Sequence, residues 1–133
     1  MEKDLFIVGK RTSAGTPLNL GVGSLEVSGN RLKGIAVFAF KEYLTTSELD
    51  LFATNVNRVA GKCFNISPER AGAVTAWLTR QNQTSLRNVT QVFGPMKARF
   101  VRDITSGGSY YTAVYLSRGG TPGTSPWVNY CTQ

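Results

Sequence analysis

The hydrophobic period of this sequence changes twice, and the two changes limit the folds that the chain can adopt. Before residue 42, apolar residues alternate with polar ones or form short runs, as they do in strands. Between residues 45 and 81 they recur at helical spacing, and after residue 87 the period of two returns. With 133 residues, the chain is close to the commonest size of one domain. We therefore expect a single α+β domain.

Three strands are expected before the helices. The apolar run Leu5 to Val8 predicts the first strand, and alternation over residues 18–27 predicts a second strand with a bulge beyond Gly23. Residues 28–30 have the composition of a turn. Residues 31–41 are so rich in apolar side chains that we expect this third strand to be buried over most of its length.

The first helix is expected to begin with a capping box. Thr45 and Glu48 have the spacing at which a hydroxyl and a carboxylate each accept a bond from an otherwise unpaired backbone N–H. Gly61 is expected to end this helix, because glycine readily adopts the left-handed conformation found at helix C-termini. A divalent-cation site or an acid–base pair at Glu42, Glu48 and Asp50 is the alternative interpretation, but capping explains these carboxylates more simply.

A second helix is expected from Ser67, the candidate cap, with Pro68 in its first turn. The polar run Arg80 to Arg87 is expected to end it. The resulting helical hairpin would bury both apolar stripes against a sheet. The apolar stripe consists of Ala71, Val74, Trp77 and Leu78.

Two or three further strands are expected after residue 87. The predicted architecture is α+β: antiparallel sheet or sheets of five to six strands, with a central two-helix hairpin packed on one side, in the order βββ-αα-βββ. Residues 1–120 are expected to form this single domain. Three glycines and two prolines between Gly119 and Pro126 interrupt any periodicity, so residues 121–133 are predicted to form a C-terminal edge strand or an extended arm.

The net charge is positive and unevenly distributed. Fifteen basic residues against eight acidic ones give +7, which favours phosphate-rich partners. Residues 71–133 carry six basic residues against Asp103 alone, so they hold +5 of that charge. The uneven distribution supports a phosphate-binding role, and a basic surface that only aids solubility is an alternative of equal weight.

Composition also excludes several classes of chemistry. Without histidine, the chain cannot build an imidazole-based triad or a histidine metal centre, so we expect no enzyme, no cofactor and no metal site. Two cysteines are too few for a disulfide framework, and we expect Cys63 to be a small core residue. Residues 1–4 do not have the basic-then-apolar pattern of a leader, so none is expected, and no apolar run reaches the ~20 residues that a bilayer requires. A cytoplasmic protein without a membrane partner is therefore expected.

The last predicted hairpin has two candidate registers around residues 105–108. A two-residue turn would place Lys97, Arg99 and Asp103 on one face with aliphatic side chains. A three-residue loop at residues 106–108 separates the charged side chains from the aliphatic ones better. One face then collects Met96, Ala98, Phe100, Ile104, Tyr110, Thr112, Val114 and Leu116, and only Arg102 does not fit. We therefore expect the second register.

In that register the other face combines two cations with two tyrosines. Lys97 and Arg99 would contact phosphates, and bases would stack on Tyr111 and Tyr115, as single-stranded nucleic acid requires. The structural alternative is that the tyrosines are partly buried rim residues. Further positive charge is expected next to this face if the first three strands lie alongside the hairpin. Those candidate residues are Lys10, Arg11, Arg31 and Lys33.

Three functions follow from these features. The first is a non-enzymatic nucleic-acid-binding protein, for single-stranded DNA or RNA in preference to duplex. The second is a viral or mobile-element coat or assembly protein, which would form homo-oligomers through an arm containing Trp127 and Tyr130. The third is a small inhibitor or adaptor that binds a host protein. No motif is specific enough to name a family.

Overall fold

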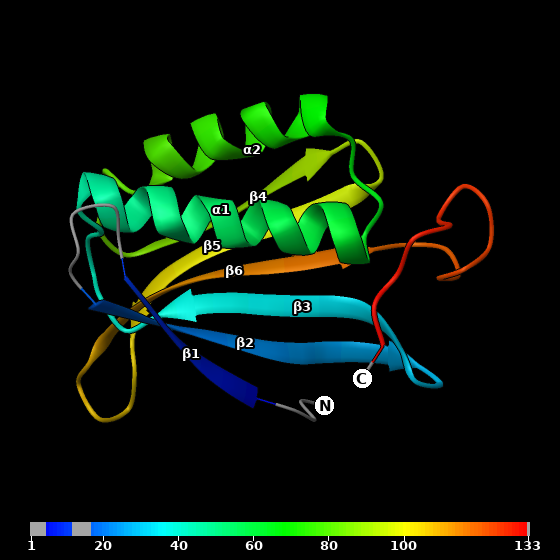
Figure 1. Cartoon of the computed structure of the whole chain (residues 1–133). Coiled ribbons are helices and arrows are strands. Elements are labelled where there is room, and N and C mark those ends of the chain that lie inside the picture. The colour runs from blue at the N-terminus through cyan, green and yellow to red at the C-terminus, as the bar shows by residue number, and fades with distance from the viewer. Residues whose placement is uncertain (1–4, 12–16, 133) are drawn as a thin grey trace.

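The chain folds into one antiparallel sheet with two helices on one of its faces (Figure 1). A computed structural model describes residues 5–11 and 17–132, with side chains from Leu20 onward. The predicted α+β class and the order βββ-αα-βββ are confirmed. The elements are β1 (Leu5–Arg11), β2 (Pro17–Ser28), β3 (Arg31–Ala39), α1 (Thr46–Cys63), α2 (Pro68–Gln81), β4 (Arg87–Phe93), β5 (Met96–Ile104) and β6 (Tyr110–Arg118).

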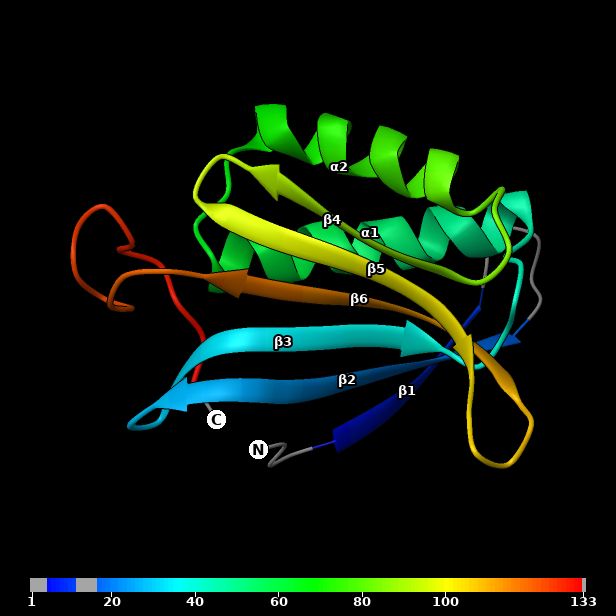
Figure 2. The same cartoon turned by 180° about the vertical axis from the view of Figure 1, so that it is seen from behind.

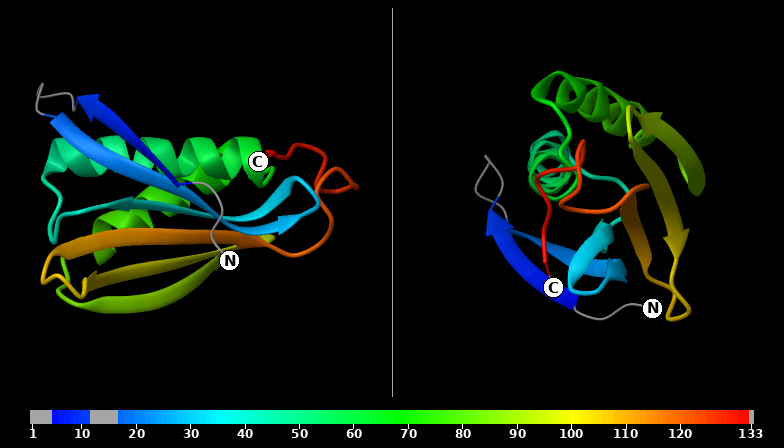
Figure 3. Two further views of the ribbon diagram at one scale, coloured as in Figure 1. Left: turned by 90° about the horizontal axis from the view of Figure 1, so that it is seen from below. Right: turned by 90° about the vertical axis from the view of Figure 1, so that its right-hand side faces the viewer.

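The six strands follow the order β1-β2-β3-β6-β5-β4. Each group of three consecutive strands forms a meander, and the antiparallel pairing of β3 with β6 joins the two meanders, with Val37 opposite Val114. Seen from behind, the strands lie in front of both helices (Figure 2). The right-hand view of Figure 3 shows the two helices on one side of the sheet, with the strands curving around them. One face of the sheet is therefore covered by α1 and α2, and no helix in the described ranges covers the other.

The helix α1 begins as predicted and ends later. The side chain of Thr45 accepts a bond from the N–H of Glu48, and the Glu48 carboxylate accepts one from the N–H of Thr45. The prediction that Gly61 ends the helix is wrong, because α1 continues to Cys63. Ala60 and Cys63 are buried in the core, so tertiary packing outweighs the low helix propensity of glycine here.

The helix α2 also matches the prediction, with one difference at its cap. Pro68 occupies the first turn as expected. Ser67 is the N-cap residue by position, but its side chain makes no capping hydrogen bond. Its carbonyl oxygen instead accepts a bond from the N–H of Arg70 at 3.1 Å. Backbone geometry and the proline therefore start this helix.

The core lies between the helices and the covered face of the sheet. Phe52 and Val56 enter it from α1, and Trp77 from α2. The Trp77 ring meets Phe93 and Phe100 edge to face, with centroids 5.5 and 6.1 Å apart. Edge-to-face contacts add to the burial of apolar area, so the aromatic side chains fix α2 over β4 and β5.

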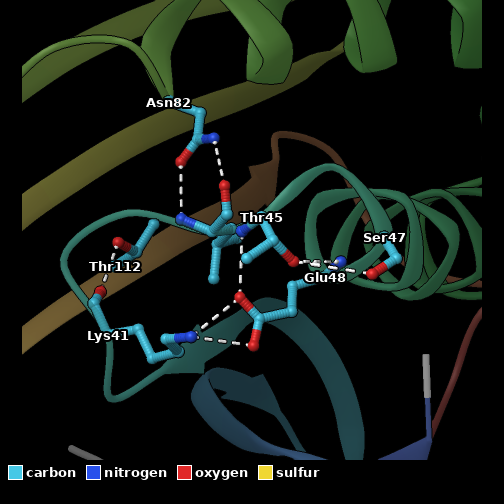
Figure 4. A network of polar contacts seen from close by, with 7 residues as sticks. Lys41, Thr45, Ser47, Glu48, Asn82 and Thr112 are labelled. Carbon is cyan, nitrogen blue, oxygen red and sulfur yellow. Dashed lines mark hydrogen bonds and ion pairs between the residues drawn. The ribbon is translucent and has the colours of Figure 1, made fainter. Parts of the chain in front are cut away.

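A polar network anchors the segment between β3 and α1 (Figure 4). The amide of Asn82 makes two bonds to the backbone of Leu44, at 3.1 and 2.9 Å. The hydroxyl of Thr112 donates to the carbonyl of Lys41 at 2.8 Å. The Lys41 ammonium forms an ion pair with Glu48, also at 2.8 Å. This segment is therefore tied to both helices and to β6.

Arg102, the residue that did not fit the apolar side of the hairpin, completes this network. It is 1% exposed, and its guanidinium donates to the carbonyls of Asn82 and Thr84 and to the hydroxyl of Thr112, at 2.7–3.0 Å. Burial lowers the pKa of Arg102, and the nearby acidic groups of Tyr43 and Glu42 oppose that shift. Arg102 is therefore a structural cation held by carbonyl dipoles.

The C-terminal segment closes one end of the core. Cys63 is buried in the core, as expected, and it forms a disulfide with Cys131 that was not predicted from the sequence. Trp127 is 1% exposed, and its indole N–H donates to the carbonyl of Cys63 at 3.0 Å. The carbonyl of Cys131 in turn accepts a bond from the N–H of Leu32 at 2.9 Å. Residues 119–132 are irregular apart from a single bridge between Arg31 and Thr132.

Candidate functional site

The hairpin of β5 and β6 has the register predicted from the three-residue loop. Ile104 pairs with Tyr110, and Arg99 with Tyr115. The N–H of Thr105 donates to the carbonyl of Ser109 at 2.8 Å, which closes the loop at residues 106–108. Side-chain alternation then fixes which residues share a face.

The face away from the helices, called the open face below, carries the four hairpin residues of the predicted site. Met96, Ala98 and Phe100 of β5 are buried in the core, so the alternating residues Lys97 and Arg99 are exposed on the other side. In β6, Tyr111 and Tyr115 are partly exposed. The guanidinium carbon of Arg99 lies 4.9 Å from the centre of the Tyr115 ring, a cation–π contact. The structure therefore brings the four side chains onto one surface.

Two phenylalanines of the open face were missed by the sequence reasoning. Phe38 in β3 is partly exposed, and Phe40 just beyond it is 57% exposed. Their rings meet edge to face, with centroids 5.5 Å apart. The dense apolar pattern of residues 31–41 hid this, since it suggested burial on both sides. The alternation of core residues Ile35, Val37 and Ala39 with Phe38 was the signal available.

The ring of Phe38 lies over a glycine of the neighbouring strand. Gly21 pairs with Phe38, and a Cβ atom at Gly21 would clash with the end of that ring. The missing side chain lets the end of the ring approach the backbone of β2 closely. This close approach positions Phe38 along the surface of the sheet.

Two hollows lie next to each other on the open face. The aromatic hollow, about 270 Å³, is lined by four aromatic rings together with Leu25, Thr105 and small residues; the rings are those of Phe38, Phe40, Tyr111 and Tyr115. The basic hollow, about 340 Å³, is lined by Lys97, Arg99 and Tyr115 together with Glu26 and Thr90. Tyr115 lines both, so the two hollows share one wall. An apolar aromatic site and a cationic site are thus adjacent.

The charges on the open face are mixed. Asp103 pairs with Tyr111 across the hairpin, and Glu26 lies in the basic hollow beside Lys97. Burial raises the pKa of Tyr111, and Tyr115 and Asp103 raise it further against the opposing effect of Arg99. The Tyr111 phenol therefore stays neutral at physiological pH. It adds an aromatic surface and a hydrogen-bond donor without adding negative charge.

The four additional cations predicted for the site have different positions. Lys33 lines a depression with Lys97 and Glu26 at the end of the open face. Arg31 instead donates to the carbonyl of Pro122 at 2.6 Å and lies 4.7 Å from the Tyr130 ring centre, so it holds the C-terminal segment. Lys10 and Arg11 belong to β1, but their side chains lie outside those that the structure describes.

Two of the carboxylates near α1, Glu42 and Glu48, make structural contacts. Glu48 accepts bonds from Lys41 and from the N–H of Thr45. Glu42 accepts a bond from the hydroxyl of Ser85 at 3.2 Å. Among the described residues no group of three potential metal ligands comes together. Within the same residues, no helix is both long and apolar enough to cross a bilayer.

No protein-family model, curated protein or solved structure matches this chain.

Proposed function

We propose that this protein binds single-stranded nucleic acid, DNA or RNA, through the open face of its sheet, without catalysing a reaction. The observation that carries the proposal is the contact of Arg99 with Tyr115, beside Lys97 and Tyr111, on a face that neither helix covers. Cations that follow the phosphates and rings that stack on bases are the combination used by single-strand binders.

A single strand fits this surface better than a duplex does. In a duplex the base faces are stacked on one another, so aromatic side chains cannot reach them without unpairing. The open face offers Phe38, Phe40, Tyr111 and Tyr115 in one patch, with Lys97 and Arg99 beside it. Aromatic residues on an open sheet stack unpaired bases in several known RNA-binding folds.

The direct test is a fluorescence-polarisation titration with labelled single-stranded DNA and RNA at several salt concentrations. We expect binding that weakens as salt increases, because phosphate contacts release counterions. A matched duplex is expected to bind less tightly. Absence of binding at low salt, or an affinity that does not change with salt, would overturn the proposal.

A pair of matched variants localises the binding. Arg99→Gln removes an exposed cation from the open face, whereas Arg58→Gln removes one from the exposed side of α1. We expect Arg99→Gln to weaken binding by about fivefold to tenfold, equivalent to about 1–1.4 kcal/mol, and Arg58→Gln to have little effect. Equal effects of the two variants would mean that binding follows net charge and not the open face.

The two alternative functions remain predictions. A coat or assembly role relies on an arm that reaches a neighbouring subunit, yet Trp127 lies in the core of its own chain. Size-exclusion chromatography after nuclease treatment tests it, since an oligomer that survives nuclease supports assembly. An adaptor role predicts capture of a protein from lysate that nuclease does not release.

The cellular location remains a prediction as well. The Cys63–Cys131 disulfide is typical of oxidising compartments, so it argues against the cytoplasmic location expected from the sequence. Alkylation of rapidly quenched cells, followed by mass measurement of the protein, distinguishes the two. Labelling of both cysteines without reductant supports a cytoplasmic location, and labelling of neither contradicts it.

A further inference from the structure

The floor of the aromatic hollow is built from small residues placed diagonally between large ones. Across the sheet, Gly23 pairs with Ala36, and Ala36 pairs with Tyr115. In the next row of the open face, Phe38 pairs with Ala113. Small side chains at Ala36 and Ala113 therefore lie at opposite corners, and Phe38 and Tyr115 at the other two. This alternation leaves a depression whose walls are aromatic.

We infer that the aromatic hollow holds one unpaired base of a bound strand, with the neighbouring phosphate in the basic hollow. This inference rests on the proposed function and adds to it a defined base site. The hollow, about 270 Å³, is smaller than most small-ligand pockets, which span about 300–1,000 Å³. A flat heterocycle suits it better than a whole nucleotide does.

The wall that the two hollows share determines how the base and the phosphate would be placed relative to each other. Tyr115 lines both hollows, and Arg99 lies over its ring. A base in the aromatic hollow would therefore lie within one nucleotide step of Arg99 and Lys97. Glu26 at the same depression repels a phosphate, so Lys97 and Arg99 must outweigh it. Charge complementarity favours a polyanionic nucleic-acid strand over a second copy of this sheet face, which would carry the same two cations, Lys97 and Arg99.

The first experiment varies the ligand. A thymidine oligonucleotide is compared with an abasic strand of the same length, which keeps every phosphate and lacks every base. Both are titrated into the full chain by fluorescence polarisation. We expect the abasic strand to bind about tenfold more weakly, because stacking of one base is worth that order of affinity.

The second experiment varies the hollow itself, and its main variant fills the hollow without removing an aromatic ring or a charge. Ala113→Val adds two methyl groups to its floor and suits a strand. We expect it to weaken thymidine binding by about fivefold to tenfold and to leave abasic binding unchanged. Phe38→Leu is expected to act in the same direction. Tyr130→Leu is the matched control, because Tyr130 is also an exposed ring beside an arginine but lies in the C-terminal segment.

The outcomes separate this inference from the proposed function. The base site would be overturned if the thymidine and abasic strands bound equally well and Ala113→Val had no effect. If Arg99→Gln still weakened binding in that case, the nucleic-acid-binding function would stand. No binding of either strand at low salt would overturn both. Thermal unfolding checks that each variant folds, and Ala36→Val, which fills the same floor from β3, replaces Ala113→Val if the latter does not.

Discussion

Arg99 and Arg102 lie three residues apart in β5 and serve opposite purposes. Arg99 is exposed on the open face, where its guanidinium covers Tyr115. Arg102 points to the helix side and is bonded to two carbonyls and two side-chain oxygens. Sequence alternation predicted the side for each of them. It did not predict the partners of Arg102, because Asn82 and Thr84 lie in the connection between α2 and β4, and Thr112 lies in β6.

The difference between the two arginines gives a stability prediction. Arg102→Leu removes the donor of four hydrogen bonds to buried or partly buried oxygens, which costs about 2–4 kcal/mol of unfolding free energy. Arg99→Gln is expected to change that free energy by less than about 0.5 kcal/mol, since the residue is exposed. Urea unfolding followed by circular dichroism measures both. Equal stability of the two variants would contradict the structural role of Arg102.

Glu48 gives a prediction in pH. Burial raises its pKa, but hydrogen bonds from Lys41 and Thr45 outweigh burial, so the pKa lies below its usual value. A carboxyl group whose pKa is lower in the folded chain than in the unfolded chain stabilises the fold at pH values above its unfolded pKa, about 4.3. This stabilisation is lost as the pH falls through the pKa of the folded chain. Glu48→Gln should therefore cost about 1 kcal/mol at neutral pH and progressively less below about pH 4. A cost that is the same at both pH values would contradict the ion pair.

For the helix α1, local sequence signals predicted the first residue better than the last residue. The spacing of Thr45 and Glu48 correctly placed the start of α1, because a capping box is a contact within four residues. The end of the same helix depends on packing around Cys63 and Phe64, which sequence does not reveal. The hairpin register was predictable because residues 96–118 segregate apolar from charged side chains in only one register.

The pairing of Cys63 with Cys131 was not predictable, because 68 residues separate them. The C-terminal segment brings Cys131 to the end of α1 through Trp127, whose indole bonds to the Cys63 carbonyl. The exposed rings of Phe38 and Phe40 were missed for a related reason. Their exposure depends on both helices covering the same face of the sheet, which is a property of the whole molecule.

The disulfide leads to a prediction about the C-terminal segment. Cys131→Ala removes a crosslink that closes a loop of 68 residues, so we expect a loss of about 3–5 kcal/mol in unfolding free energy. Affinity for a single strand should remain unchanged while the variant is folded, because neither hollow is lined by residues of this segment. Urea unfolding with and without dithiothreitol measures the first effect. Identical unfolding of variant and parent would contradict the crosslink.

At the scale of the whole molecule, the order of elements leaves one sheet face for binding. The two helices between β3 and β4 cover the same side, and the meanders on either side of them join through β3 and β6. The join places Phe38 from the first meander beside the Arg99 and Tyr115 pair from the second. Chain regions with different composition thus form one surface, on which the excess positive charge of the second half meets the aromatic residues of the first.

The salt dependence of binding by a double variant is the direct test of whether single-stranded nucleic acid binds at the open face. Lys97→Gln with Arg99→Gln removes the two open-face cations of the basic hollow. If both contact phosphates, the slope of log affinity against log salt should become less steep by about 1.4 for a single strand. We expect that change for the double variant and none for Arg58→Gln. An unchanged slope in the double variant would contradict binding through the open face.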